Sequence, residues 1–352
     1  MNLDFYKGKK VLVTGHTGFK GTWLCKMLLK QGAEVCGFAL EPKAEQVLFE
    51  LSKIEKDMQS VICDIRDYEA LRKIYDSFAP EIVIHLAAQP IVKDSYIYPK
   101  LTYETNVLGT LNILECIRKT DCVRSFLNVT TEKVYENNEE ENVTIDETFP
   151  LNGYDPYSNS KSCSDIITQC YKKCFLNEGR CAVSTARTSN AIGGGDFSQH
   201  RIISDCMKAA INGTDILVRN KYSERPYQYV LEPLSVYLKI CQMQYDDISY
   251  QGSYNVAPDF GIKTEKIVSL FCQKWGNYLK WIDCSVEGPY EASLLKVSNM
   301  KLKETFGWKQ KYSIEKTIEK IVEWTRCYIT SPDMIDWQMN KEIDDFMSFE
   351  KE

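Results

Sequence analysis

Three patterns in the sequence predict an α/β chain in which a doubly wound parallel sheet is followed by a smaller C-terminal domain. Short β-branched runs alternate with amphipathic stretches over the first half, which is typical of βαβ units. Three glycines stand where the first strand must turn into a helix. After Thr185 this order loosens, and the glycines at 193–195 and the proline-punctuated region at 225–233 indicate a change of architecture.

The expected elements alternate along the chain. Strands are expected at 10–14, 34–38, 59–63, 82–86 and 125–129, each a short apolar run of the buried type. Helices are expected at 20–31, 68–77, 103–118 and 157–175. We place a soft boundary near residue 190, with 1–189 as the first domain and 190–330 as mainly a second domain, interleaved with the first. The acidic tail at 331–352 is expected to form a peripheral helix or to stay partly mobile.

Composition and charge exclude several classes of protein. The 352 residues are 44% hydrophobic and 26% charged, which is ordinary for a globular chain of more than one domain. The 43 basic and 49 acidic residues give a net charge of -6 without a basic patch, so no nucleic-acid partner is expected. No long apolar run occurs, so we expect no membrane association and a cytoplasmic location.

The 14 cysteines include no C-x-x-C pair, and we expect most of them to be small buried hydrophobic residues. Cys170 and Cys174 lie one helical turn apart and are the best candidates for a metal site. The three histidines of the chain show no zinc-finger spacing, however, so the ligand set is incomplete. We therefore expect no metal.

Gly15, Gly18 and Gly21 form a G-x-x-G-x-x-G pattern between the first expected strand and the helix after it. Glycine permits positive φ and a close approach of backbone N–H groups to a pyrophosphate, whose charge then lies at the helix N-terminus. A plain structural turn is the alternative. The context favours a dinucleotide-binding turn and hence an extended Rossmann fold.

Two acidic residues are candidates for recognising the adenosine half of the dinucleotide. A carboxylate near the end of the second strand normally binds the ribose, and Glu41 is the nearest one, which favours NAD over NADP. Asp64, after the third strand, is placed to meet the adenine or simply to cap a loop.

Tyr157 and Lys161 are spaced i and i+4, so they share one face of an expected helix. A tyrosine that acts as a base near neutrality needs its pKa lowered from about 10 by about three units. A fixed lysine charge, together with a positive nicotinamide ring, would stabilise the phenolate. The alternative is an ordinary surface pair.

Thr131, Glu132 and Lys133 follow the strand at 125–129, at the end of the sheet where ligands bind in open α/β folds. Thr131 can hydrogen-bond a substrate hydroxyl, while Glu132 and Lys133 offer an acid and a base. The alternative is a charged, solvated turn.

Taken together, these motifs resemble the extended short-chain dehydrogenase/reductase family, and within it the CDP-glucose 4,6-dehydratases. The resemblance covers nearly the whole chain. It is carried by G-H-T-G-F-K-G at 15–21, A-L-E-P at 39–42, A-A-Q-P at 87–90, T-N-V-L-G-T at 105–110, G-Y-D-P-Y-S-N-S-K at 153–161, I-G-G-G-D at 192–196 and V-L-E-P-L at 230–234.

The resemblance implies that NAD takes a hydride from sugar C4, that water leaves across C5 and C6, and that the hydride returns to C6. Tyr157 would be the base for C4 oxidation, Lys161 its electrostatic partner, and Thr131 an aid to the 4-hydroxyl. Lys133 would remove the C5 proton, and Glu132 would protonate the departing 6-hydroxyl.

The resemblance also implies binding residues. Matching cofactor positions are Gly15, Thr17, Gly18, Phe19, Lys20, Gly21, Glu41, Asp64, Ile65, Ala87, Ala88, Gln89 and Asn106. Matching substrate positions are Asn190, Asp196, Arg201 and Arg225. Guanidinium groups suit a diphosphate, although each arginine would serve equally in a structural ion pair.

The chain departs from the usual family residues at several positions. These are Glu132 in place of aspartate, Phe197 and Tyr227 in place of tryptophan, Tyr229 in place of histidine, and Thr188 and Ser189 in place of small residues. The sugar pocket is therefore expected to be altered, and a CDP-hexose other than glucose, or a CDP-heptose, is an open alternative.

Other functions and the partners follow from the same resemblance. A nucleotide-sugar epimerase, decarboxylase or reductase would use Tyr157 and Lys161 without elimination, and a non-catalytic NAD-binding regulator would need neither. A homodimer is expected through the helices at 103–118 and 157–175. The 4-keto-6-deoxy products of such enzymes usually feed bacterial surface polysaccharides.

Overall fold

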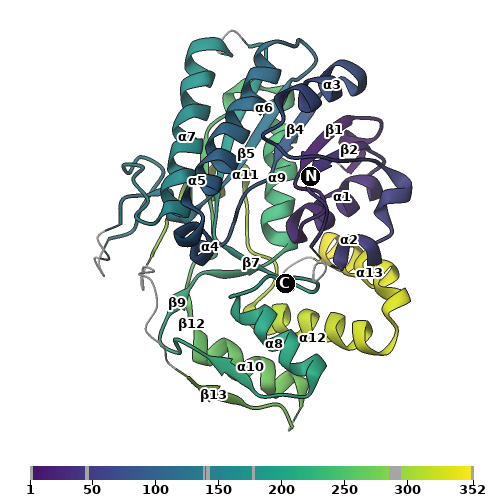
Figure 1. The fold of residues 1–352 in the computed structure, drawn as a ribbon, viewed down its shortest axis with the longest axis vertical. Helices are drawn as coiled ribbons and strands as arrows, with labels where there is room; N and C mark the ends of the chain where they lie inside the picture. Colours follow the sequence, from purple (N-terminus) through teal and green to yellow (C-terminus); the bar gives the residue numbers. More distant parts are fainter. Residues whose placement is uncertain are drawn as a thin grey trace.

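The computed structural model describes residues 3–43, 47–137, 139, 143–176, 179–276, 278–284 and 295–349. Its centre is a seven-stranded sheet in the order β11-β6-β5-β4-β1-β2-β3, with every neighbouring pair parallel (Figure 1). The strands are β1 (Lys10–Thr14), β2 (Glu34–Ala39), β3 (Gln59–Ile62), β4 (Ile82–His85), β5 (Ser125–Thr131), β6 (Ala182–Thr188) and β11 (Ser253–Val256).

The strand order reverses between β1 and β4, which makes the sheet doubly wound. Strands β2 and β3 extend to one side of β1, while β4, β5, β6 and β11 extend to the other. In such sheets the ligand crevice opens at the carboxyl ends of the strands, next to this reversal. All residues of β4 and β5 are buried, as expected for central strands covered on both faces.

Helices cover both faces of the sheet. The helices of the described residues, including those beside the smaller sheets, are α1 (Phe19–Lys30), α2 (Leu48–Leu51), α3 (Tyr68–Phe78), α4 (Val92–Ile97), α5 (Pro99–Tyr103), α6 (Gly109–Arg118), α7 (Pro156–Phe175), α8 (Ile202–Asn212), α9 (Leu231–Asp246), α10 (Thr264–Trp275), α11 (Met300–Phe306), α12 (Ile314–Thr330) and α13 (Ile335–Ser348). One core cluster joins α3 and α6 to the sheet through residues such as Leu71 and Leu114. The larger cluster joins α1 and α9 through residues such as Leu28 and Leu238.

From residue 190 onward, the described residues form three two-stranded sheets beside the large one. They pair β7 (Asn190–Ile192) with β10 (Tyr227–Tyr229), β9 (Glu224–Arg225) with β12 (Ile262–Lys263), and β8 (Ile216–Val218) with β13 (Trp281–Asp283). With α8, α10 and α12 they occupy the lower part of Figure 1. Strand β11 and helix α9 instead belong to the large sheet and its cover. The division near residue 190 stays a prediction.

The expected strands and helices are confirmed, with local differences. The single helix expected at 103–118 is divided into α5, a π-helical segment at Glu104–Leu108 and α6. The strand expected at 125–129 continues to Thr131, because Thr130 and Thr131 pair with Arg187 and Thr188 of β6.

The C-terminal tail, for which a peripheral helix or partial mobility was expected, forms helix α13. Helix α13 buries Ile335, Met339, Ile343 and Phe346 in the larger core cluster. It packs on α1 and α12, and an ion pair between Lys26 and Asp336 joins it to α1.

Candidate active site

The expected dinucleotide turn has the geometry that its glycines predict. Gly15 has a φ of +77°, and a Cβ on Gly21 would lie 2.0 Å from the Gly15 carbonyl oxygen, so neither position accepts a side chain. Helix α1 begins at Phe19, and its N-cap residue, Gly18, offers no side-chain cap. The first N–H groups of α1 are therefore available to an anion, which is the arrangement that binds a pyrophosphate.

The loop after β4 packs against this turn, since a Cβ on Gly15 would lie 2.9 Å from the Ala87 nitrogen. Thr14 holds the loop, because its hydroxyl oxygen accepts the N–H groups of Leu86 and Ala87, both at 3.1 Å. The Thr14 hydrogen is then free for His85 Nδ1, 2.7 Å away. His85 is accordingly neutral, and burial, followed by the Lys161 charge, lowers its pKa to about 3.

Asn106 lies behind the loop rather than open to the crevice. Its side chain accepts from the Gln89 N–H at 2.8 Å and donates to the Gln89 carbonyl at 3.1 Å and to Ser160 at 2.9 Å. These bonds occupy its amide, so the structure favours a positioning role for Asn106 over the direct cofactor contact that we expected.

The two acidic candidates follow neighbouring strands, Glu41 after β2 and Asp64 after β3. Glu41 is exposed one residue beyond Leu40, whose carbonyl accepts a hydrogen bond from the Thr17 hydroxyl of the turn at 2.9 Å. Asp64 is bound by Arg66 at 2.7 Å, which lowers the pKa of its carboxyl, and Ile65 packs against Gly109. The roles of Glu41 and Asp64 toward a nucleoside stay predictions.

A cavity of about 660 Å³ opens at the carboxyl ends of β5 and β6. The expected residues that line it are Lys20, Thr131, Glu132, Lys133, Tyr157, Asn190, Asp196, Arg201 and Arg225. Residues that the sequence did not single out also line it, among them Lys93, His200 and Arg219. Six lysines and arginines face two carboxylates in this lining, so the cavity suits an anionic ligand.

Helix α7 places the expected catalytic pair. Asp155 caps the helix by accepting the Ser158 N–H at 2.9 Å, and Pro156 is its first residue, so Tyr157 stands in the first turn. Lys161 is buried one turn later, where its ammonium donates to the Val129 carbonyl of β5 at 3.1 Å. Burial, with a smaller effect of the Lys20 charge, lowers the pKa of Lys161 to about 8.

The expected stabilisation of a Tyr157 phenolate by Lys161 and a nicotinamide ring stays a prediction, because the protein groups around Tyr157 together act on its pKa in the opposite direction. Burial raises the pKa of Tyr157, and the nearby Glu132 raises this pKa further. Arg201 and a hydrogen bond with Thr131 oppose the rise. The phenol therefore keeps its proton near neutrality, because its loss of hydration outweighs the stabilisation by nearby cations.

The segment at 131–133 is not a solvated turn. Only 2% of Glu132 is exposed, and the Thr131 hydroxyl donates to its carboxylate at 3.1 Å. Burial raises the pKa of Glu132, while Lys133 opposes the rise. A carboxyl that holds its proton to higher pH is suited to act as an acid, and it shares the cavity with Tyr157 and Lys133.

The candidate phosphate-binding arginines are partly engaged. Arg201 pairs with Asp196 at 3.2 Å, and both line the cavity. Arg219 pairs with Asp205 at 2.7 Å and donates to His200 Nδ1 at 3.0 Å. No sequence motif pointed to Arg219 and His200, because only the folding of the chain beyond β7 brings them to the cavity.

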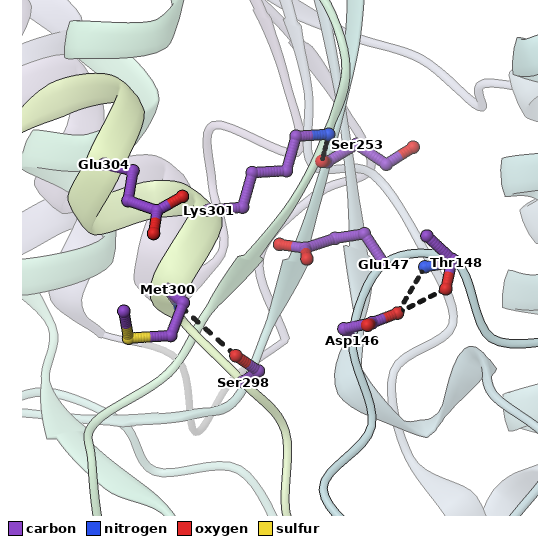
Figure 2. A pocket seen from close by; sticks show the side chains of 8 residues that line it. All are labelled: Asp146, Glu147, Thr148, Ser253, Ser298, Met300, Lys301 and Glu304. Atoms are coloured by element: carbon purple, nitrogen blue, oxygen red, sulfur yellow. Dashed lines mark hydrogen bonds between the residues drawn. The ribbon is translucent and has the colours of Figure 1, made fainter.

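A second cavity of about 410 Å³ lies between the loop at 146–148, β11 and α11 (Figure 2). Its polar groups largely bond within the protein: Lys301 donates to the Ser253 carbonyl at 2.9 Å, and Glu147 accepts the Asn255 N–H at 2.7 Å. None of the expected site residues lines it.

Within the described ranges, no group of three or more His, Cys, Asp or Glu side chains is arranged to hold a metal ion. No helix in the same ranges is long and apolar enough to cross a membrane.

Comparisons with known proteins agree with this geometry. The family described as GDP-mannose 4,6 dehydratase matches residues 12–321. A CDP-glucose 4,6-dehydratase of Salmonella typhimurium is 38% identical over 98% of this chain and 98% of its own length. The chain belongs to this dehydratase family, within the extended short-chain dehydrogenase/reductases.

Two solved structures confirm the expected α/β fold. A dTDP-glucose 4,6-dehydratase from Bacillus anthracis in complex with NAD has a TM-score of 0.76 at 20% identity, over 91% of this chain and 97% of that one. A UDP-glucose 4-epimerase of Thermus thermophilus, also in complex with NAD, has a TM-score of 0.78 at 24% identity, over 90% and 98%.

Proposed function

We propose that the protein is an NAD-dependent nucleotide-sugar 4,6-dehydratase, a hydro-lyase that acts on CDP-glucose or on a related CDP-hexose or CDP-heptose. The buried Glu132 carboxyl carries this proposal, because an acid with a raised pKa, beside Lys133 and in the cavity of Tyr157, is what elimination requires. The 38% identity to a CDP-glucose 4,6-dehydratase supports the choice of nucleotide.

The residues present fit NAD. The turn at Gly15–Gly21 would hold the pyrophosphate, with the loop at Ala87–Gln89 beside it. When bound, NAD would accept a hydride from sugar C4 and return it to C6. Its positive nicotinamide ring would also supply the charge that Tyr157 lacks in the chain alone, because a nearby cation favours the phenolate.

The side chains at the carboxyl end of β5 and in the first two turns of α7 then divide the proton transfers. Tyr157 takes the proton of the 4-hydroxyl, with Thr131 as its hydrogen-bonding partner. Lys161, whose ammonium donates to the Val129 carbonyl, adds a fixed positive charge one helical turn away from Tyr157. Once C4 is a ketone, the C5 proton is acidic, and Lys133 removes it while Glu132 gives its proton to the departing 6-hydroxyl, so that one water leaves.

The positively charged side of the cavity suits the diphosphate of the substrate. Arg201 and Arg225 present guanidinium groups, and Asn190 and Asp196 lie beside them in the lining. Bidentate hydrogen bonds from guanidinium to phosphate are among the stronger polar contacts in proteins.

We also propose a homodimer. Large apolar side chains are exposed on neighbouring elements, namely Ile97 of α4, Leu101 of α5, Leu108 of the π-helical segment, and Ile166 and Phe175 of α7. Exposed apolar side chains gathered on neighbouring elements are suited to contact a second copy of the chain. The cytoplasmic location and a role in making surface polysaccharides are part of the same proposal.

The test is to incubate the purified protein and NAD with CDP-, dTDP-, GDP- and UDP-sugars and to measure product masses. We expect the loss of one water from a CDP-sugar without net formation of reduced cofactor. A product of unchanged mass would support an epimerase, and stoichiometric reduced cofactor would support an ordinary dehydrogenase. Either result would overturn the proposal.

A further inference from the structure

Ser189 is a cavity residue whose hydroxyl accepts one hydrogen bond from the described residues and donates none to them. It follows the last residue of β6, lines the cavity of Tyr157 and is 2% exposed. A buried hydroxyl without adequate partners costs free energy, so its bonds are informative. The site described above assigns it no role.

Gln228 of β10 fixes one of these bonds. Its amide nitrogen donates to Ser189 Oγ at 2.8 Å and to the Val256 carbonyl oxygen at 2.8 Å. The Val256 carbonyl oxygen can only accept a hydrogen bond, so the Gln228 atom that faces it must be the amide nitrogen. The alternative orientation, with the amide oxygen in this place, is therefore excluded. The same nitrogen faces Ser189, whose oxygen is therefore an acceptor in this bond.

The Ser189 hydroxyl hydrogen is then left as a donor. A hydroxyl carries one hydrogen and two lone pairs, and Gln228 uses one lone pair. Within the described parts of the chain, no protein group accepts the Ser189 hydrogen, and the backbone N–H of Ser189 already donates to Val256 at 3.0 Å. Ser189 lines the cavity, so a bound ligand is the remaining candidate to accept this hydrogen.

We propose that Ser189 donates a hydrogen bond to the 2- or 3-hydroxyl oxygen of the substrate's sugar, and that Gln228 is the positioning residue that makes Ser189 a donor. This rests on the proposed function. Ser189 follows Thr188, which pairs with Thr131 in the sheet, so it lies at the reacting end of the cavity. The 4- and 6-hydroxyls of the sugar react with Tyr157 and Glu132, so the 2- and 3-hydroxyls remain as partners for Ser189.

The test compares kcat/KM for CDP-glucose, CDP-2-deoxyglucose and CDP-3-deoxyglucose in the wild type and in Ser189→Ala. We expect the variant to lose about 3- to 10-fold with CDP-glucose, the usual worth of one neutral hydrogen bond. With the analogue that lacks the bonded hydroxyl, it should lose nothing further. An equal loss with all three substrates, or weaker binding of CDP itself, would overturn the assignment to a sugar hydroxyl.

Matched variants separate this role from a structural one. Gln228→Met removes the amide donor at similar volume and should weaken the same selectivity, whereas Ser189→Thr keeps a hydroxyl and should retain it. Ser184→Ala removes a hydroxyl of β6 that bonds Gln244 outside the cavity, and it should leave the substrate ratios unchanged. If Ser184→Ala changes them as Ser189→Ala does, the inference fails.

The outcome for the wild type is independent of these ratios. A wild type that removes water from no CDP-sugar overturns the proposed function, whereas an active wild type with an unselective Ser189→Ala variant overturns only this inference.

Discussion

Asp165 of α7 and Arg187 of β6 form a bidentate ion pair, with Nε to Oδ2 at 2.8 Å and Nη2 to Oδ1 at 3.0 Å. Their side chains are 0% and 2% exposed. Arg187 also donates to the Tyr135 hydroxyl at 2.9 Å and to the Glu147 carbonyl at 3.1 Å. The pair therefore ties the helix that carries Tyr157 to the strand that borders the cavity.

Asp165→Asn should destabilise the fold severely, because it leaves the Arg187 charge buried without its partner. Breaking a buried ion pair in this way typically costs about 3–5 kcal/mol. The measurement is the free energy of unfolding in denaturant. Asp76→Asn, which breaks the more exposed pair with Arg72, is the control and should cost about 0.5 kcal/mol or less. Similar costs for the two variants would contradict the role of the buried pair.

Tyr157→Phe should lower kcat by a factor of about 100 to 10,000, the usual worth of general-base help, with NAD affinity close to normal. The dinucleotide turn lies on a different element, so cofactor binding measured by calorimetry should not change greatly. Tyr154→Phe alters an exposed tyrosine of the preceding loop and serves as the control. Near-normal turnover by Tyr157→Phe would rule out its role as the base.

Lys133→Met and Glu132→Gln should spare the oxidation at C4 and block the elimination. The absorbance of reduced cofactor should then rise on the enzyme after CDP-glucose is added, whereas the wild type shows no net change. Lys133→Met should also abolish exchange of the C5 proton with deuterated solvent, which Glu132→Gln need not do. If both variants remove water at the wild-type rate, these residues do not perform the elimination.

The buried Glu342 predicts a stability that falls with pH. Burial raises its pKa to about 7, although hydrogen bonds with Tyr229 and Gln338 and the Lys320 charge oppose the rise. The unfolded value is about 4.3, so the unfolded chain releases this proton first. The contribution of Glu342 is thus fully present below about pH 4 and is lost as the pH rises through about 7.

Melting temperatures of the wild type and Glu342→Gln, measured from pH 5 to about pH 8.5, test this prediction. The variant carries a neutral amide and keeps a donor and an acceptor for its neighbours, so its melting temperature should fall less steeply with pH. Parallel curves for the two proteins would contradict the raised pKa.

Local spacing was sufficient to predict the main elements and the core of the site. The glycines of the turn, and Tyr157 with Lys161, stand at short fixed intervals, so each prediction depended on residues that are close together in the sequence. The structure brings Tyr157 together with Thr131 and Glu132 because strand order places the ends of β5 and β6 beside the N-terminus of α7.

Other features depend on contacts between distant segments and leave no local pattern. The pKa of Tyr157 depends on the burial of its ring, and this burial cannot be predicted from the spacing between Tyr157 and Lys161. In the sequence, the glycines at 193–195 indicate only a change of architecture and form part of a family motif. A Cβ on Gly194 would lie 2.0 Å from the Trp324 ring, so this glycine is a packing requirement set by α12. The bond between Gln228 and Ser189 likewise joins residues 39 positions apart.

The contact between α13 and α1 has a consequence for biosynthesis. Lys26 and Asp336 are 310 positions apart, and Lys30 pairs with Asp344 on the same two helices. Helix α1 therefore leaves the ribosome early and lacks the apolar cover of α13 until residues 335–348 have followed it. During that interval the dinucleotide-binding half of the protein exposes the apolar surface that α13 later covers. Folding of this half is therefore completed late in synthesis, and chaperones can bind the exposed surface until then.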